Sequence, residues 1–355
     1  MSNPKEIPFQ NLVDALLDEN VPFHPRYLYR LSDIIQADVA LLKKAWPQVS
    51  AQRRQAVMED LEELNMADDL LSFEEVARLA LNDSEPGVRR LAIRILGEYE
   101  LKDLAPTFVH ILEKDRSTEV RAAAAAALGA FVYLGEVEEL QPATWHRIEE
   151  SLLNAYRSDS EVLVRRRALE ALGFSSREEL PPMIEQAYTS GDSDWLISAL
   201  MAMGRSADER WNPQVLGMLD HKHPLVRAEA AAAAGELEIA QAGKRLLDLL
   251  EDPDSDVRAA AIWSLSQIGG EGVAVRLQRM LNHSSDDDEA QLIEQAMENL
   301  AFTEGGHGFS MGNAMEDDDL AGEDEDEDQL DELDELDDDF EDAYLDDLLD
   351  EDDEV

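Results

Sequence analysis

Hydrophobic positions along this chain follow a helical spacing, and the same arrangement returns at nearly regular intervals. When the first residue of each copy is position zero, small or apolar residues stand at +4, +5 and +8, and +4 is always alanine. Residues with this spacing lie on one face of an α-helix. Successive copies are 31 or 32 residues apart, with one interval of 44, and they begin at Val88, Val120, Val164, Trp195, Val226 and Val257.

A second apolar helical segment and a short turn precede each copy, as in residues 73–86 and 244–254. A repeat of roughly 20–50 residues built as helix, turn and helix is typical of a solenoid. The predicted fold class is therefore all-α: a right-handed α-solenoid of antiparallel helix pairs, followed by a disordered acidic tail. The 44-residue interval predicts extra residues near 131–144, as a longer loop or helix. Glycine at +9 in five of the six copies indicates a helix end or a tight helix crossing.

An aspartate stands six residues before the repeated arginine in four copies. An acid in a turn and a base at the next helix start can form hydrogen-bonded pairs from repeat to repeat. In the fifth copy the nearest acid, Asp220, is seven residues before Arg227. The alternative, that these arginines line a basic groove, is disfavoured by the aspartate spacing. The predicted structural ladder comprises Asp83 and Arg89, Asp115 and Arg121, Asp159 and Arg165, and Asp252 and Arg258.

The Asp–Arg spacing and the helix pairs resemble HEAT repeats, an armadillo-like helical family in which this pair forms a ladder along the solenoid. The roughly 31-residue period resembles the short HEAT-like type named after phycobilisome lyases. The resemblance covers about residues 70–300 and implies a fold, since this type occurs in proteins of many activities. We expect a helical N-terminal cap of degenerate repeats over 1–70, the repeat solenoid over 71–302, a flexible linker over 303–315 and an acidic tail over 316–355.

Charge is unevenly distributed over the 355 residues. The formal net charge is -50, and residues 316–355 hold 26 acidic and no basic residues. Such a chain repels phosphate backbones and favours basic partners. It has no cysteine, which excludes thiolate metal sites and thiol nucleophiles. We find no signal peptide, membrane-spanning run, phosphate-binding loop or nucleophile elbow, and we expect a cytoplasmic protein without cofactor or metal.

Positions +2 and +6 of the second helices are the candidate binding residues, because they lie away from the core set. They change along the chain from basic to apolar and would suit an amphipathic helix with acidic flanks. The alternative is that they only pack between repeats or face solvent. The candidate groove residues, with Arg167 added, are Arg90, Arg94, Arg166, Arg167, Ile197, Met201 and Trp263.

The tail contains apolar residues at steps of three and four within residues 330–349, a spacing that places them on one helical face. We predict a recognition helix that folds on a partner; the alternative is a solubilising tail. It would bind a basic partner or occupy the protein's own groove and compete with ligands. Its predicted contact residues are Leu333, Leu336, Phe340, Tyr344, Leu345 and Leu348.

The predicted function is that of a non-catalytic protein-binding scaffold or adaptor. One alternative is a HEAT-like lyase or enzyme subunit; another is a DNA-binding HEAT-like protein, which the negative charge disfavours. HEAT-like deoxyhypusine hydroxylase carries iron on repeated His-Glu pairs, and this chain has no His-Glu dipeptide. The pair His221 and His223 favours an exposed turn over a metal site, because no acid cluster or third histidine accompanies it in sequence.

Overall fold

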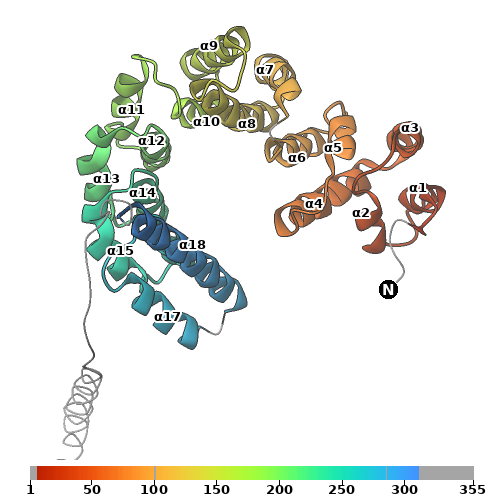
Figure 1. The fold of residues 1–355 in the computed structure, drawn as a ribbon. Helices are drawn as coiled ribbons and strands as arrows, with labels where there is room; N and C mark the ends of the chain where they lie inside the picture. Colours follow the sequence, from red (N-terminus) through yellow and green to blue (C-terminus); the bar gives the residue numbers. More distant parts are fainter. Residues whose placement is uncertain (1–5, 100, 285, 312–355) are drawn as a thin grey trace, which may run out of the picture. The chain divides into compact units, whose positions relative to one another are not determined.

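The computed structural model describes residues 6–99, 101–284 and 286–311, with side chains described as far as Phe302. Within these residues every regular element is a helix, and the predicted all-α solenoid is confirmed (Figure 1). The N-terminal part contains α1 (Phe9–Leu17), α2 (Arg26–Arg30), α3 (Gln36–Ala45), the short η2 (Trp46–Gln48) and α4 (Ala51–Ala67). The packing described below lies within the compact unit Met1–Gly306.

The repeats follow as helix pairs, each with a first and a second helix. Three first helices are preceded by a single 3₁₀ turn, namely η3 (Lys102–Leu104), η4 (Glu209–Trp211) and η5 (Ala240–Ala242). The first helices are α5 (Glu74–Ala80), α7 (Ala105–Lys114), α9 (Pro142–Ser158), α11 (Leu180–Tyr188), α13 (Asn212–Met218), α15 (Gly243–Leu249) and α17 (Val273–His283). The second helices are α6 (Pro86–Gly97), α8 (Thr118–Glu136), α10 (Val162–Leu172), α12 (Ser193–Arg205), α14 (Pro224–Glu236), α16 (Ser255–Ile268) and α18 (Asp287–Met311).

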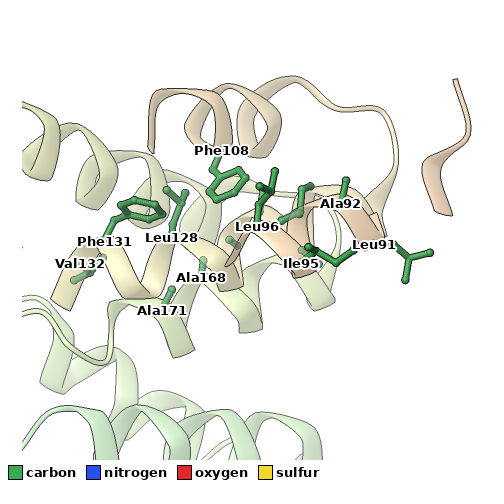
Figure 2. Packing of buried hydrophobic residues seen from close by; sticks show 14 of the residues in the cluster. Leu91, Ala92, Ile95, Leu96, Phe108, Leu128, Phe131, Val132, Ala168 and Ala171 are labelled. Carbon is green, nitrogen blue, oxygen red and sulfur yellow. The ribbon is translucent and has the colours of Figure 1, made fainter. Parts of the chain in front are cut away.

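Helix α4 packs against α6, and from α6 to α16 each second helix packs against the next one. Each of these second helices also packs against the first helix of its own pair. The predicted core face is confirmed: at positions +4, +5 and +8 all eighteen side chains of the six copies are buried. First helices complete the core, as where the ring of Phe108 on α7 meets the edge of Phe131 on α8 at 6.0 Å between ring centroids (Figure 2). Edge-to-face contacts of this kind add stability beyond buried area alone.

Glycine at +9 allows neighbouring second helices to approach closely. A Cβ atom on Gly173 would lie 2.9 Å from the Cα of Ala202, and one on Gly235 would lie 2.9 Å from the Cα of Ser264. Gly204 faces Ala233 in the same way, with 3.1 Å to its Cα. At these three positions a larger residue would push two backbones apart, whereas a Cβ on Gly97 or Gly129 would meet its nearest atom only at 3.5 or 3.4 Å.

The interval of 44 residues lengthens both helices beside it, because α8 has 19 residues and α9 has 17. The expected C-terminal linker needs a correction. Helix α18 begins at Asp287 and continues to Met311, over nine residues that we predicted to be linker. Once a helix is nucleated, each further residue adds one backbone hydrogen bond, so it can extend past weak helix formers. Residues 312–315 lie outside the described residues.

Candidate functional site

The repeated arginines and aspartates form a charge ladder between successive turns, with one Arg–Asp pair as a rung. Arg89 donates from Nε and Nη2 to the two carboxylate oxygens of Asp115, at 2.8 and 2.9 Å. Arg121 does the same with Asp159, at 2.9 and 3.0 Å. Arg227 reaches Asp252 with both distances at 2.8 Å. Each pair therefore joins one repeat to the next by a bidentate, charge-assisted contact.

Each ladder aspartate also organises its own turn. The Oδ1 atom of Asp115 accepts from the backbone N–H of Ser117 at 2.8 Å. Burial alone would raise the pKa of the Asp115 carboxyl, but the hydrogen bonds from Arg89 and Ser117 outweigh it and lower that pKa. The pKa of Asp159 is lowered against burial in the same way, by Arg121 and a backbone N–H. These carboxylates are therefore held in their charged form.

The ladder is closed at both ends by residues that the repeat pattern did not reveal. At the N-terminal end, Asp83 accepts from Arg54 Nη2 at 3.0 Å and from Trp46 Nε1 at 2.7 Å. At the other end, Arg258 donates from Nε to Glu289 at 2.8 Å. Arg54 and Glu289 stand in eroded repeats, so no fixed offset in the sequence identifies them.

The ladder is interrupted between α10 and α14. Asp159 accepts from Arg121 of the preceding repeat, as the other ladder aspartates do, so Arg165 would need an acceptor from the following turn. Among the described residues, the buried Nε of Arg165 has no hydrogen-bond partner, and its guanidinium carbon lies 5.5 Å from the ring centroid of Trp195. The position that should carry the next aspartate is Ser190, and the position of the next arginine is Leu196.

The two turns of this region keep the side-chain-to-backbone hydrogen bond that a ladder aspartate would make. Ser190 Oγ accepts from the backbone N–H of Asp192 at 3.2 Å, as a ladder aspartate does two residues further on. One repeat later, His221 Nδ1 accepts from the N–H of His223, also at 3.2 Å. A neutral acceptor is therefore enough to shape the turn, while a carboxylate is needed to pair with an arginine.

A hollow of ≈ 670 Å³ lies over the second helices α6, α8 and α10. It contains three of the seven predicted groove residues: Arg90, Arg94 and Arg167. Its floor is formed by one face of α8, with Ala122, Ala123, Ala126, Ala127 and Ala130. Four arginines and three glutamates line it, which makes it slightly positive in a chain of net charge -50.

The other predicted groove residues do not line this hollow. Arg166 is turned into the protein, where it donates from Nε to Ser198 at 2.9 Å and from Nη1 to Asp194 at 2.6 Å. Ile197 and Met201 are half-buried on α12. Trp263 is 38% exposed and packs where a side chain on Gly235 would otherwise lie.

Glutamates form an unexpected polar region between α10, α12 and α14. Glu170 is buried and accepts from Ser198 Oγ and Arg167 Nη1, both at 2.6 Å. Burial raises the pKa of Glu229 to about 7, and the nearby carboxylates of Glu236 and Glu170 add to this effect. Burial also raises the pKa of Glu236, although Arg205 opposes the change.

The predicted recognition helix lies outside the described residues. Within the described residues there is no group of three or more side chains suited to hold a metal ion. In the same part of the chain, we find no helix with the length and apolar character that crossing a bilayer requires.

A family model of HEAT repeats matches residues 74–144 and 212–298. These two segments are therefore HEAT repeats, as the period and the Asp–Arg spacing predicted. Residues 145–211, between the two matches, contain Arg165, Ser190 and Leu196, where the ladder is interrupted. No curated protein matched the chain.

Several solved structures are similar to the chain. The complex of CpcE and CpcF of phycocyanin lyase from Nostoc sp. is 22% identical, covers 64% of this chain and 94% of that chain, and has a TM-score of 0.42. Human deoxyhypusine hydroxylase is 20% identical over 75% of this chain and 96% of that chain, with a TM-score of 0.32. Importin beta is 14% identical over 83% of this chain and 51% of that chain, with a TM-score of 0.34.

Proposed function

We propose that this HEAT-repeat chain is a non-catalytic protein-binding scaffold whose hollow over α6, α8 and α10 holds an amphipathic helix with acidic flanks. One observation carries the proposal: the alanine floor of α8 is bordered by arginines from two neighbouring second helices. Small side chains leave room for the apolar face of a bound helix, and guanidinium groups at the border select acidic flanks.

Two details of the hollow support a binding role for these arginines. Among the described residues Arg90 makes no hydrogen bond or ion pair, and it lines the hollow, so its guanidinium group is available to a ligand. Arg94 is paired with Glu62 at 2.6 Å but remains half exposed. Ala126 and Ala130 on the floor are exposed, whereas Ala124 and Ala125 of the same helix are buried in the core.

Binding of defined peptides tests the proposal. Three labelled amphipathic helices with one common apolar face and acidic, neutral or basic flanks are titrated with the full chain, and fluorescence anisotropy gives the Kd. We expect the acidic-flanked peptide to bind most tightly. Ala126→Phe, which fills the hollow from an exposed position, and Arg90→Glu should each weaken it by about tenfold.

Arg116→Glu is the matched control, because it makes the same charge change at an exposed turn residue that does not line the hollow. We expect it to change the Kd by less than about twofold, through the long-range field alone. Equal affinity for acidic and basic flanks, or equal losses in Arg90→Glu and Arg116→Glu, would contradict the groove proposal.

We propose in addition that the acidic tail regulates this hollow by competing with its ligands. The tail carries the same combination of acidic and apolar residues that the hollow would select. Deleting residues 316–355 should then raise the affinity for the acidic-flanked peptide. Unchanged affinity, together with unchanged hydrogen exchange on the repeat helices, would leave only the alternative that the tail engages a basic partner in trans.

The enzymatic and DNA-binding alternatives have less support. The hollow contains arginines, glutamates and alanines but no histidine or serine that could act as a nucleophile and its base. A gel shift with duplex DNA at low and high salt tests DNA binding, for which we expect no retardation. Retention of a pigment or metal by the purified chain would favour the lyase or enzyme-subunit alternative.

A further inference from the structure

The interrupted part of the charge ladder has the features of a second ligand site, which we name the open rung and define as Arg165, Ser190 and Trp195. Every other arginine of the ladder has a carboxylate from the following repeat. Arg165 occupies the same position on its helix, but the following turn offers the serine hydroxyl of Ser190. A hydroxyl cannot accept the two parallel N–H bonds that the guanidinium fork presents.

The local surroundings cannot replace the missing carboxylate. Among the described residues neither Asp192 nor Asp194 pairs with Arg165: Asp192 accepts from the N–H groups of Asp194 and Trp195 at 2.8 and 3.1 Å, and Asp194 accepts from Arg166 at 2.6 Å. Asp159, on the other side, is held by both nitrogen donors of Arg121. Within the described residues the guanidinium of Arg165 lies over the ring of Trp195 and near the carboxylate of Asp159, which Arg121 already binds.

Because part of the guanidinium is buried, the missing partner is unfavourable, and a ligand that supplies an acceptor would gain binding free energy. The Nε atom of Arg165 is shielded from solvent and has no acceptor among the described residues. A buried donor without a partner is unfavourable, and a suitable acceptor would remove this cost. Trp195 and Tyr156 stand edge to face at 6.1 Å between ring centroids and supply an apolar wall beside the charge.

We propose that the open rung binds the carboxylate of an aspartate or glutamate in an acidic peptide segment, which takes the place of the absent ladder aspartate. Val162 is 49% exposed and stands one helical turn before Arg165 on α10. An apolar residue beside the acid would contact this valine, so the selected segment combines acidic and apolar side chains. The open rung uses none of the residues that line the hollow of the proposed function.

A pair of substitutions with equal charge distinguishes this site from general electrostatic attraction. Ser190→Asp supplies the missing carboxylate from within the chain, so it should close the rung and exclude the ligand. His221→Asp adds the same charge in the equivalent turn of the next repeat, where Leu196 offers no arginine to pair with. Only the first change should therefore affect both stability and binding.

The probe is a fluorescein-labelled synthetic peptide with the sequence of residues 330–349, and its reference has every Asp and Glu replaced by Asn and Gln. Fluorescence anisotropy with the full chain gives the Kd. We expect Arg165→Ala and Ser190→Asp each to weaken the acidic peptide about tenfold, and His221→Asp less than twofold. Ser190→Asp should also raise the urea midpoint of unfolding, which His221→Asp should leave unchanged.

Equal effects of Ser190→Asp and His221→Asp, or an unchanged Kd in Arg165→Ala, would overturn the proposal. The acid can come from a partner or from this chain's own acidic residues, and deleting residues 316–355 separates these sources. Stronger peptide binding after the deletion assigns the carboxylate to the chain itself, and unchanged binding assigns it to a partner. No binding in either form overturns the proposal. All variants are compared in the Ala126→Phe background, in which the hollow proposed to take the same tail segment is filled, so that a change in Kd reports the open rung alone.

Discussion

The repeats from α5 to α10 and those from α10 to α14 stack in the same way but are linked by different side chains. In the first region the ladder pairs Arg89 with Asp115 and Arg121 with Asp159. In the second region Gly173 and Gly204 still allow close backbone crossings, yet among the described residues the ladder arginine Arg165 pairs with no carboxylate, and Arg166 pairs with Asp194 instead. Close packing of small residues is therefore enough to stack repeats, and the ladder is an additional link that can be lost locally.

Three glutamates of the second region stand on its second helices. Glu170 binds Ser198 and Arg167, and Glu229 and Glu236 lie near Arg205. The equivalent face of α8 in the first region carries alanines. The two regions should consequently respond differently to mutation and to pH.

Removing one ladder arginine from each region should give the largest difference in stability between the two regions. In the intact pair the side chain of Asp159 is 13% exposed, and Arg121→Ala removes its bidentate partner, which should lower the free energy of unfolding by about 3 kcal/mol. Arg165→Ala removes a guanidinium that pairs with no carboxylate among the described residues and should cost less than about 1 kcal/mol. Urea unfolding followed by circular dichroism measures both, and equal losses would show that the ladder does not distinguish the regions.

The second expected effect is a pH dependence that belongs to the second region. The folded-state pKa of Glu229 is raised to about 7 by burial, above its usual value of 4.5, so its contribution to stability is complete below pH 4.5 and is lost as the pH rises through 7. Glu229→Gln removes this loss and should stabilise the protein by about 2 kcal/mol at pH 8.5. At pH 4.5 the two proteins should unfold at nearly the same urea concentration.

The acid side of the same profile reports the ladder aspartates, which include Asp115 and Asp159 of the first region and Asp252 beyond the second. The folded-state pKa values of Asp115 and Asp159 are lowered, so their contribution to stability is complete above the ordinary aspartate pKa and is lost as the pH falls through the lowered values. Glu229→Gln should leave this acid limb unchanged. An alkaline limb that persists in Glu229→Gln would assign the pH dependence to another group.

The sequence predicted the fold because each repeat contains its own folding information. Ala92, Ala124 and Ala168 recur at one helical position, and all three are fully buried. The rungs at Arg89 and Arg121 were also predictable, since an aspartate in the turn and an arginine six residues later repeat together. Asp159 pairs with the arginine of the preceding repeat, in keeping with the predicted links from repeat to repeat, whereas the pattern gave no sign of Arg54 and Glu289 at the two ends.

The candidate site was less predictable because it depends on departures from the pattern. Arg166 stands at a groove position but donates to Asp194, and nothing in its spacing signals this contact. Ser190 and Leu196 were visible as eroded positions, yet their consequence for Arg165 follows only from the stacking of two repeats. The raised pKa of Glu229 likewise depends on carboxylates from neighbouring helices.

The smallest expected effect tests whether the ladder can be rebuilt where it is missing. Leu196→Arg together with His221→Asp places an arginine and an aspartate at the two ladder positions of the second region. Leu196 packs partly against the core, so the single change to arginine should destabilise the protein. The double-mutant cycle subtracts the effects of the two single changes, and it should give a coupling energy of about 1 kcal/mol in favour of the pair. His221 already accepts the N–H of His223, as a ladder aspartate would, so the turn needs no rearrangement. A coupling energy near zero would mean that the turns of the second region are spaced too differently for a rung, and that packing alone sets their distance.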